Sequence, residues 1–269
     1  MGRALIVDAH QHFWDPARAD YPWMTDDVAA IRRRFGPEDL EPVLRVNAVD
    51  ETIVVQARHS LDETHELLEL AAATPFVRGV VGWVDLTDPA VGDVLSQLGG
   101  GLVGVRHQVQ DEPDPEWLLR PDVRRGLAAV GEAGIVFDLL VRARELPAAT
   151  ETVRALPQVR FVVDHLAKPP LRDGSTGAWA EGLAALAALP NVACKLSGLV
   201  TEAEPGQELV PYVRRALDLF GAERCMFGSD WPVCLLAAEY GEVLALVTGA
   251  LHEDERAAVL GGTAVRVYA

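Results

Sequence analysis

Two histidines near the start of the chain, His10 and His12, have the types and spacing that most clearly suggest chemistry. They follow an apolar run, residues 4–7, that predicts a β-strand, and side chains two positions apart in a strand point the same way. Their imidazoles can therefore converge on one point, as a metal ion or a polarised carbonyl group requires. Together with Asp230, in the segment Phe-Gly-Ser-Asp-Trp-Pro at residues 227–232, they suggest a hydrolytic centre built from the first and last strands of a closed barrel.

Further polar and titratable side chains lie at or near the carboxyl ends of predicted strands, and these are Gln56, Arg106, His107, Asp138, Asp164, His165 and Lys195. In α/β barrels this is the end of the strands that carries the active site. Each residue also has a structural interpretation. His107 or His165 alone could be a hydrogen-bonded structural histidine, and Asp138 could pair with a neighbouring cation. Lys195 could extend past the rim of the sheet. Their joint position favours a functional site.

The elements that must position these residues are eight short runs rich in Val and Ile, which alternate with stretches of helical spacing. The predicted strands are residues 4–8, 52–56, 80–84, 102–106, 135–141, 160–164, 192–196 and 225–227. Strand–helix alternation predicts a parallel sheet with right-handed crossovers. Eight units favour an α/β fold of the closed (β/α)8 TIM-barrel type, in one domain over residues 1–269. A long first connection, residues 14–50, should overhang the active face.

Composition excludes some classes of function. The chain has 269 residues, 49% of them hydrophobic, and a net charge of −16, which argues against nucleic-acid binding. Three cysteines are too few for a disulfide framework, and no run of 18 apolar residues predicts a membrane span. We therefore expect a cytoplasmic protein with a small-molecule partner and no membrane partner; the sequence leaves open whether it forms a homo-oligomer.

Five motifs resemble the amidohydrolase superfamily, and they lie at residues 8–16, 104–107, 163–169, 194–199 and 227–232. The chain looks most like the lactonase branch that contains L-fuconolactonases, L-rhamnono-lactonases and 2-pyrone-4,6-dicarboxylate lactonases. Trp14-Asp15-Pro16 before Tyr21-Pro22-Trp23, and Gln108-Val109-Gln110 before Trp117-Leu118, resemble the sugar-lactonase members in particular. The likeness covers essentially the whole chain.

The resemblance implies that His10, His12, His165 and Asp230 occupy the positions that hold the metal and the catalytic base in this superfamily. Many amidohydrolases place a carboxylated lysine on the fourth strand and a histidine on the fifth, to bind two metals. Here those strands offer His107 and Asp138 instead, so a binuclear centre is not expected. The resemblance implies either one Zn²⁺ or other divalent metal with an open coordination position, or a metal-independent enzyme.

The implied reaction is the opening of a sugar-acid lactone by water. Asp230 is the expected general base, because a free aspartate has a pKa of about 3.9 and is ionised at neutral pH. Side chains expected to contact the substrate are Arg106, His107, Lys195, Gln56, Trp14 and Trp231; the two tryptophans could equally be core residues. Two alternatives remain at this point: a Zn-dependent decarboxylase of an aromatic or unsaturated acid, and a non-catalytic barrel that binds a small ligand.

Overall fold

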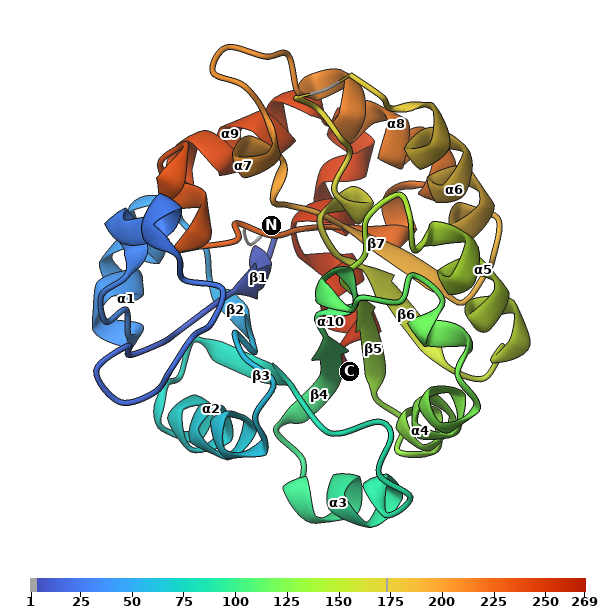
Figure 1. Cartoon of the computed structure of the whole chain (residues 1–269). Helices are drawn as coiled ribbons and strands as arrows, with labels where there is room; N and C mark the ends of the chain where they lie inside the picture. Colours follow the sequence, from blue (N-terminus) through green and yellow to red (C-terminus); the bar gives the residue numbers. More distant parts are fainter. Residues whose placement is uncertain (1–3, 173) are drawn as a thin grey trace.

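Eight parallel strands in sequence order form the centre of the molecule, and helices surround them (Figure 1). The computed structural model describes residues 4–172 and 174–269. The strands are β1 Val7–Gln11, β2 Glu51–Val55, β3 Val77–Gly82, β4 Leu102–His107, β5 Val136–Leu139, β6 Arg160–Val163, β7 Val192–Leu196 and β8 Cys225–Phe227. Each strand pairs in parallel with the next one along the chain. The predicted (β/α)8 barrel is confirmed.

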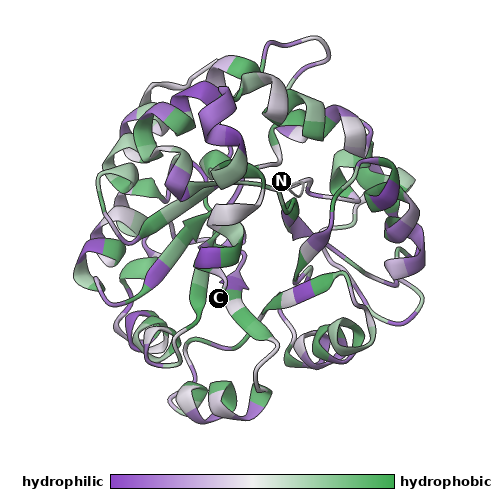
Figure 2. Cartoon of the chain, turned by 180° about the vertical axis from the view of Figure 1, so that it is seen from behind, coloured by the Kyte–Doolittle hydropathy of each residue, from purple (hydrophilic) through white to green (hydrophobic). Residues whose placement is uncertain are grey.

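The surrounding helices pack one apolar side against the barrel, as the residues that α8 buries show: Val213, Ala216, Leu217 and Phe220. Figure 2 shows the same contrast, with largely hydrophobic strands inside helices of mixed character. The α-helices are α1 Pro37–Val46, α2 Leu61–Ala73, α3 Val91–Leu98, α4 Pro121–Glu132, α5 Leu146–Ala155, α6 Gly177–Ala187, α7 Leu199–Glu202, α8 Val210–Phe220, α9 Tyr240–Ala250 and α10 Thr263–Val267. Over residues 4–172 and 174–269, none of the helices has the length and apolar character that crossing a membrane requires.

The barrel closes through backbone hydrogen bonds between β1 and the segment that follows β8. The N–H of Asp230 donates to the carbonyl of His10 at 2.8 Å, and the N–H of His12 donates to the carbonyl of Trp231 at 2.7 Å. A parallel bridge between Gln11 and Trp231 lies at the same place. Barrel closure itself therefore brings the two ends of the chain together at the predicted site.

The first strand begins later than predicted. Residues 4–8 were expected to form it, but pairing with β2 begins at Val7, opposite Glu51. Leu5 is 41% exposed, so the first part of the apolar run lies outside the barrel rather than in its wall. His10 consequently lies inside the strand, and His12 follows it directly.

The register of β1 against β2 shifts between Asp8 and Gln11, and such irregularities re-aim side chains at a strand end. His10, within this stretch, and His12, just after it, both face the carboxylate of Asp230. The other strand boundaries differ less. β3 begins three residues earlier than predicted and β5 is shorter, while Asp164 opens a 3-10 turn instead of ending β6.

The barrel interior has an apolar layer beneath the site. Strand residues such as Ile53, Val81 and Val162 pack there against Ala264 and Tyr268 from the C-terminal segment. The C-terminus accordingly lies at the middle of the barrel in Figure 1. The three cysteines, Cys194, Cys225 and Cys234, are free and buried.

Candidate active site

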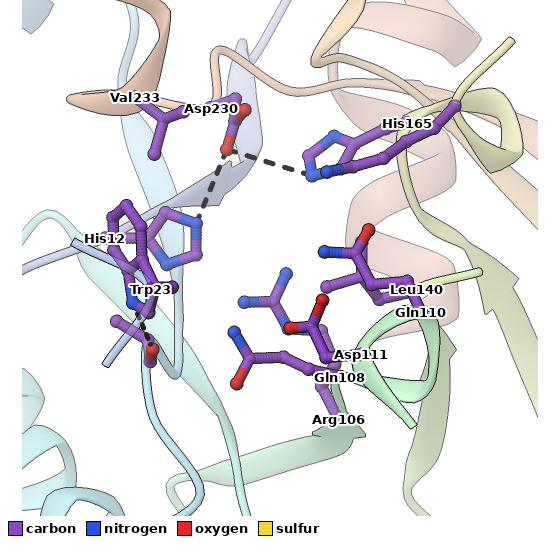
Figure 3. A pocket seen from close by; sticks show the side chains of 12 residues that line it. His12, Trp23, Arg106, Gln108, Gln110, Asp111, Leu140, His165, Asp230 and Val233 are labelled. Atoms are coloured by element: carbon purple, nitrogen blue, oxygen red, sulfur yellow. Dashed lines mark hydrogen bonds and ion pairs between the residues drawn. The ribbon is translucent and has the colours of Figure 1, made fainter. Parts of the chain in front are cut away.

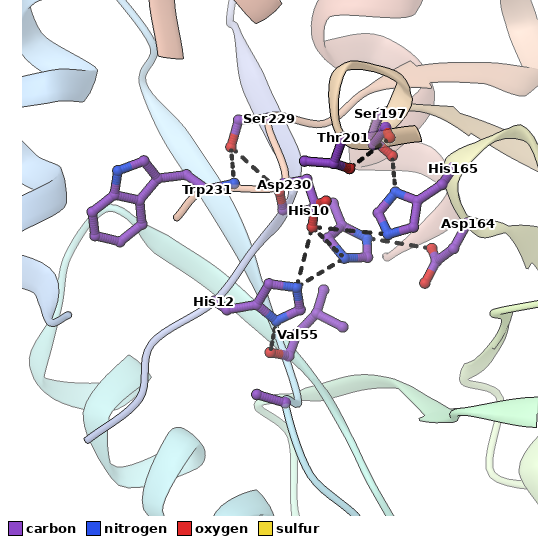
Figure 4. Close-up of polar contacts among 12 residues, drawn as sticks. His10, His12, Val55, Asp164, His165, Ser197, Thr201, Ser229, Asp230 and Trp231 are labelled. Carbon is purple, nitrogen blue, oxygen red and sulfur yellow. Dashed lines mark hydrogen bonds and ion pairs between the residues drawn. The ribbon is translucent and has the colours of Figure 1, made fainter. Parts of the chain in front are cut away.

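Three acceptor atoms converge at the carboxyl end of the barrel, on the seam between β1 and β8. The Nε2 atoms of His10 and His12 lie 3.2 Å apart, and each faces Oδ1 of Asp230, at 3.6 and 3.4 Å respectively (Figure 4). All three side chains are buried. Residues more than two hundred positions apart in sequence therefore meet around one small volume, as the sequence predicted.

Contacts to the two nitrogens of each ring indicate which nitrogen carries the proton. Nδ1 of His12 lies 2.7 Å from the carbonyl oxygen of Val55, which can only accept, so Nδ1 is protonated and Nε2 presents a lone pair. Nε2 of His10 lies 3.2 Å from Nη1 of Arg106, which can only donate, and its Nδ1 lies 3.3 Å from Oδ1 of Asp164, which accepts, so a lone pair on Nε2 and a proton on Nδ1 satisfy both contacts. Nζ of Lys195, 3.2 Å from the same Nδ1, then directs its hydrogens to Asp138 and Asp164.

Two imidazole lone pairs and one carboxylate oxygen that face one another repel unless a cation, or a water that donates hydrogens, lies between them. Tetrahedral zinc, with ligands at about 2.0–2.1 Å, holds its ligand atoms roughly 3.3 Å apart, which matches the observed separations. His10, His12 and Asp230 therefore fit one divalent metal ion. His10 would have to exchange its hydrogen bond from Arg106 for the metal bond.

His165 approaches the same carboxylate from the other side, with Nε2 3.8 Å from Oδ1 of Asp230. It begins a turn of four residues, His165 to Lys168, whose φ angles of 46–56° are left-handed although none is glycine. Such backbone costs about 1–3 kcal/mol per residue and is typical of functional sites. The turn is held by the indole N–H of Trp179, which donates to the carbonyl of Leu166 at 2.7 Å.

The ring of His165 is held from β7. Its Nδ1 lies 2.8 Å from Oγ of Ser197, and Gly198 packs against the ring so closely that a Cβ there would lie 2.5 Å from Cγ of His165. Glycine is therefore required at position 198, where φ is also +67°. Burial lowers the pKa of His165 to about 4, so the ring is neutral at neutral pH.

Beneath the histidines lies a buried network of charged groups. Nζ of Lys195 contacts Oδ2 of Asp138 at 2.5 Å, Oδ1 of Asp164 at 3.0 Å and Nδ1 of His10 at 3.2 Å. The hydroxyl of Tyr268 donates to the other oxygen of Asp138 at 2.7 Å. The suggested pairing of Asp138 with a cation is thus observed, and Lys195 points into the barrel rather than past its rim.

Arg106, at the end of β4, connects this network to the cavity. Its Nη1 donates to Asp164 at 3.1 Å, and its Nη2 donates to Oε1 of Gln56 at 3.2 Å. Burial alone would raise the pKa of Asp164, but Lys195, His10 and Arg106 hold it well below its usual range. Gln56 therefore positions Arg106.

Asp230 is ionised at neutral pH. Burial would raise the pKa of its carboxyl group, but contact with His165, His12 and His10 lowers it below the usual range for an aspartate. Across the centre and its floor, the carboxylates of Asp138, Asp164 and Asp230 face the cations Arg106 and Lys195. These three carboxylates and two cations together carry one net negative charge, which favours a metal ion or a proton.

A cavity of about 160 Å³ opens above this centre (Figure 3). It is lined by His12, Trp23, Ala57, Arg106, Gln108, Gln110, Asp111, Leu140, His165, Lys168, Asp230 and Val233. Four of the predicted site residues, His12, Arg106, His165 and Asp230, line it, and His10 lies directly behind them.

Three of the predicted substrate-binding residues lie behind the cavity wall. Lys195 and Gln56 are fully buried and bind the groups described above. His107 lies between Trp83 Nε1, which donates to its Nδ1 at 3.2 Å, and Oε1 of Glu112, 2.7 Å from its Nε2. These three side chains support the site from behind.

The two predicted tryptophans are core residues. The indole N–H of Trp14 donates to the carbonyls of Ile31 and Arg33, and 4% of the residue is exposed. Trp231 packs edge-on against Phe35 and is 2% exposed. Neither side chain lines the cavity.

The aromatic residue that does line the cavity is Trp23, which lies on the long first connection. Its N–H donates to the carbonyl of Ala57 at 2.8 Å, so this connection overhangs the active face as expected. Sequence reasoning did not assign roles to the remaining lining residues, Gln108, Gln110, Asp111, Leu140, Lys168 and Val233. The available signal was position, since Gln108 to Asp111 directly follow β4 and Lys168 follows His165 by three residues.

The fold and site together define a (β/α)8 barrel whose histidines on β1 and after β6 face an aspartate after β8. Residues 7–269 match the family described as Amidohydrolase, so the chain belongs to the amidohydrolase family. The predicted superfamily is confirmed.

Relatives with assigned activities cover nearly the whole chain. An L-fucono-1,5-lactonase of Burkholderia ambifaria is 43% identical over 97% of this chain and 94% of its own length. An L-fucono-1,5-lactonase of Burkholderia multivorans is 42% identical over 99% of this chain and 96% of its own length. A crystal structure of an amidohydrolase from Burkholderia multivorans with bound zinc is 42% identical, with a TM-score of 0.94 over 98% of this chain and 99% of that one.

Proposed function

We propose that this protein hydrolyses a sugar-acid lactone of the L-fucono-1,5-lactone kind. The observation that carries the proposal is the convergence of Asp230 with the lone pairs of His10 and His12 at the floor of a small cavity. The names and identities of the two Burkholderia lactonases support the choice of substrate.

In the proposed reaction, a water molecule in the space between His12 and Asp230 attacks the lactone carbonyl carbon. Asp230 accepts a proton from this water as the new C–O bond forms, because its carboxylate is ionised and faces that space. The bond from the carbonyl carbon to the ring oxygen then breaks, and Asp230 returns the proton to that oxygen. The product is an open-chain hydroxy acid, and its ionisation releases one proton.

The residues around this step orient the reactants. Arg106 and His165 line the cavity next to Asp230 and can donate hydrogen bonds to oxygen atoms of the substrate. Lys195, Asp138 and Asp164 lie below and hold His10 and Arg106 in place. A divalent metal held by His10, His12 and Asp230, with His165 beside it, would supply Lewis acidity and lower the pKa of a bound water.

The charges that line the cavity favour a neutral substrate over a carboxylate. Arg106 is already paired with Asp164, and Nζ of Lys168 lies 3.4 Å from Glu202. A decarboxylase or a dicarboxylate lactonase needs a cation that is free to bind the substrate carboxylate. The decarboxylase alternative is therefore less supported than a lactonase.

We further propose that the enzyme works in the cytoplasm on a small soluble sugar derivative. Three buried free cysteines and the acidic composition fit that setting.

A pH-indicator assay tests the proposal. The purified protein is mixed with L-fucono-1,5-lactone, an L-rhamnonolactone, 2-pyrone-4,6-dicarboxylate and a hydroxybenzoate, with and without added zinc, and spontaneous hydrolysis is subtracted. We expect kcat/KM of about 10⁴ M⁻¹ s⁻¹ or more for the best sugar lactone, and no turnover of the hydroxybenzoate. Absence of acceleration for every lactone would refute the lactonase proposal.

A further inference from the structure

Asp8 is a buried carboxylate on β1 to which the proposed reaction assigns no role. It lies two residues before His10, and none of its surface is exposed. It is not among the residues that line the cavity, so it does not touch a substrate bound there. A buried carboxylate needs hydrogen-bond donors that replace the water it has lost, and the position of those donors shows what the side chain does.

Each oxygen of Asp8 accepts two hydrogen bonds. Oδ1 accepts from the backbone N–H of His10 at 3.1 Å and from the backbone N–H of Ser229 at 2.8 Å. Oδ2 accepts from the hydroxyl of Ser229 at 2.6 Å and from the hydroxyl of Tyr240, the first residue of α9, at 3.0 Å. Four donors suit an ionised carboxylate, which only accepts. One side chain therefore connects β1, the loop after β8 and a helix of the outer layer.

These contacts lie on both sides of Asp230. Ser229 directly precedes Asp230, and its hydroxyl also accepts a hydrogen bond from the N–H of Trp231 at 3.0 Å (Figure 4). On the opposite strand, the carbonyl of His10 accepts from the N–H of Asp230 at 2.8 Å, while the N–H of His10 donates to Asp8. Asp8 therefore fixes the loop that carries Asp230 against the strand that carries His10.

The backbone of Asp230 needs such support. Its φ angle of +58° lies in the left-handed region, which residues other than glycine rarely adopt. Strained backbone of this kind persists only where the surrounding structure holds it in place. When the contacts to Asp8 are removed, we expect the loop to relax and the carboxylate of Asp230 to move away from the two histidines.

We propose that Asp8 is a positioning residue, which holds the carboxylate of Asp230 at the distance from His10 and His12 that a shared metal ion or water molecule requires. The observed distances of 3.6 and 3.4 Å match the separation of ligand atoms around one zinc ion. The inference rests on the proposed lactonase function for its effect on turnover, but not for its effect on metal binding.

The test compares the wild type with two variants of Asp8. Asp8→Ala removes all four contacts, whereas Asp8→Asn keeps the shape and one oxygen that can accept from both backbone N–H groups. Zinc affinity is measured by competition with a chelating dye, and kcat and KM are measured with the best sugar lactone in excess zinc.

We expect Asp8→Ala to bind zinc about 10- to 100-fold more weakly and to lower kcat by a similar factor. KM should change less than about 3-fold, because Asp8 does not contact the substrate. Asp8→Asn should recover most of both losses. If Asp8→Ala does not fold, Ser229→Ala removes the shortest of the four hydrogen bonds and should weaken zinc binding about 3- to 10-fold.

Glu145→Ala is the matched control. Glu145 is also a fully buried carboxylate that accepts a backbone hydrogen bond, from the N–H of Arg142 at 2.8 Å, but it lies after β5, across the barrel from β1. This variant should melt at a lower temperature than the wild type, yet bind zinc and hydrolyse the lactone as the wild type does.

The inference is wrong if Asp8→Ala or, where that variant does not fold, Ser229→Ala binds zinc like the wild type, or if Glu145→Ala loses as much affinity as the seam variant. If the wild type binds no zinc, kcat decides, and an unchanged kcat overturns the inference. If zinc binding weakens as expected but no lactone is hydrolysed, the positioning role stands and the lactonase proposal fails. A wild type that neither binds zinc nor hydrolyses a lactone overturns both.

Discussion

The seam between β1 and β8 and the wall formed by the turn after β4 contribute to the site in different ways. On the seam, His10, His12 and Asp230 are fixed by backbone hydrogen bonds that also close the barrel. On the wall, Gln110 is carried by a short turn and leaves a buried oxygen without a partner. The groups on the seam are therefore held by the strands that close the barrel, whereas the wall is held by a short connection.

Under the proposed function, this difference separates the groups that react from the groups that line the substrate cavity. Reacting groups need positions fixed to a fraction of an ångström, which strands of a closed barrel provide. Groups that line the cavity can lie on connections, whose length and sequence change without disturbing the barrel. We expect substitutions on the seam to abolish turnover of every substrate, and substitutions on the wall to change which substrate is preferred.

The largest effect is expected at the seam carboxylate. Asp230→Asn should lower kcat about 10²- to 10⁴-fold, because an amide cannot accept the proton of the attacking water. The thermal midpoint should change by only a few degrees. Asp111→Asn, a carboxylate on the wall, is the matched control and should lower kcat less than about 10-fold. An Asp230→Asn variant with normal kcat would remove Asp230 from the mechanism.

Substitutions in the buried charge network below the seam should lower the stability of the folded protein. Lys195→Met leaves the buried carboxylates of Asp138 and Asp164 without their shared cation, so the free energy of unfolding should fall by about 3–5 kcal/mol. Lys168→Met, which breaks a partly exposed pair with Glu202, should cost less than about 1 kcal/mol. Urea denaturation measures both. Equal losses would show that the buried network contributes no more to stability than the partly exposed pair of Lys168 and Glu202.

Metal binding should depend on the seam alone. His12→Ala removes one of the three converging ligand atoms and should weaken zinc binding at least about 100-fold, measured by calorimetry and by metal content after dialysis. His65→Ala, an exposed change on α2, should bind zinc like the wild type. Unchanged affinity in His12→Ala would place the ion away from the seam.

The smallest effect concerns the side of the cavity that carries Trp23, opposite the wall. Glu63 on α2 accepts hydrogen bonds from the N–H groups of Ala57 and Arg58, both at 3.0 Å. It therefore holds the loop after β2, whose Ala57 carbonyl accepts the hydrogen bond from Trp23. Burial raises the pKa of Glu63 from 4.5 to about 7. Because the pKa of Glu63 is higher in the folded state than in the unfolded state, its protonation stabilises the fold. This contribution to the free energy of unfolding is complete below about pH 4.5 and is lost as the pH rises through 7.

Between pH 5 and pH 8 the wild type should therefore lose about 2–3 kcal/mol of stability that Glu63→Gln does not lose. The measurement is urea denaturation of both proteins across this range, taken as a difference so that other titrating groups cancel. If the free energies of unfolding of the two proteins changed in parallel with pH, Glu63 would not be the group whose titration destabilises the wild type.

Much of the architecture could be predicted because the signals are local. Alternating apolar runs and helical spacing specify strands and helices, and eight repeats specify a barrel. β7 and β8 agree with their predicted bounds, since their apolar runs are fully buried. The first strand does not, because the exposed Leu5 belongs to the same apolar run as the buried Val7, and only pairing with β2 decides where the strand begins.

The sequence predicted which side chains converge at the centre of the candidate site, but it predicted less well which residues surround them. His10 and His12 lie two apart in one segment, and that spacing implies convergence wherever the strand lies. The burial of Trp14 and Trp231, and the exposure of Trp23 to the cavity, depend on how a 37-residue connection packs on the barrel, which local sequence does not encode.

The sequence by itself determined the fold class, the family and the histidines and aspartate that converge at the candidate site, because periodicity and residue type are properties of short segments. Tertiary structure alone decided the protonation pattern of the histidines, the burial of Lys195 and the unpaired oxygen of Gln110. Each of these depends on atoms contributed by strands distant in sequence. Such partners are assigned only when the barrel closes.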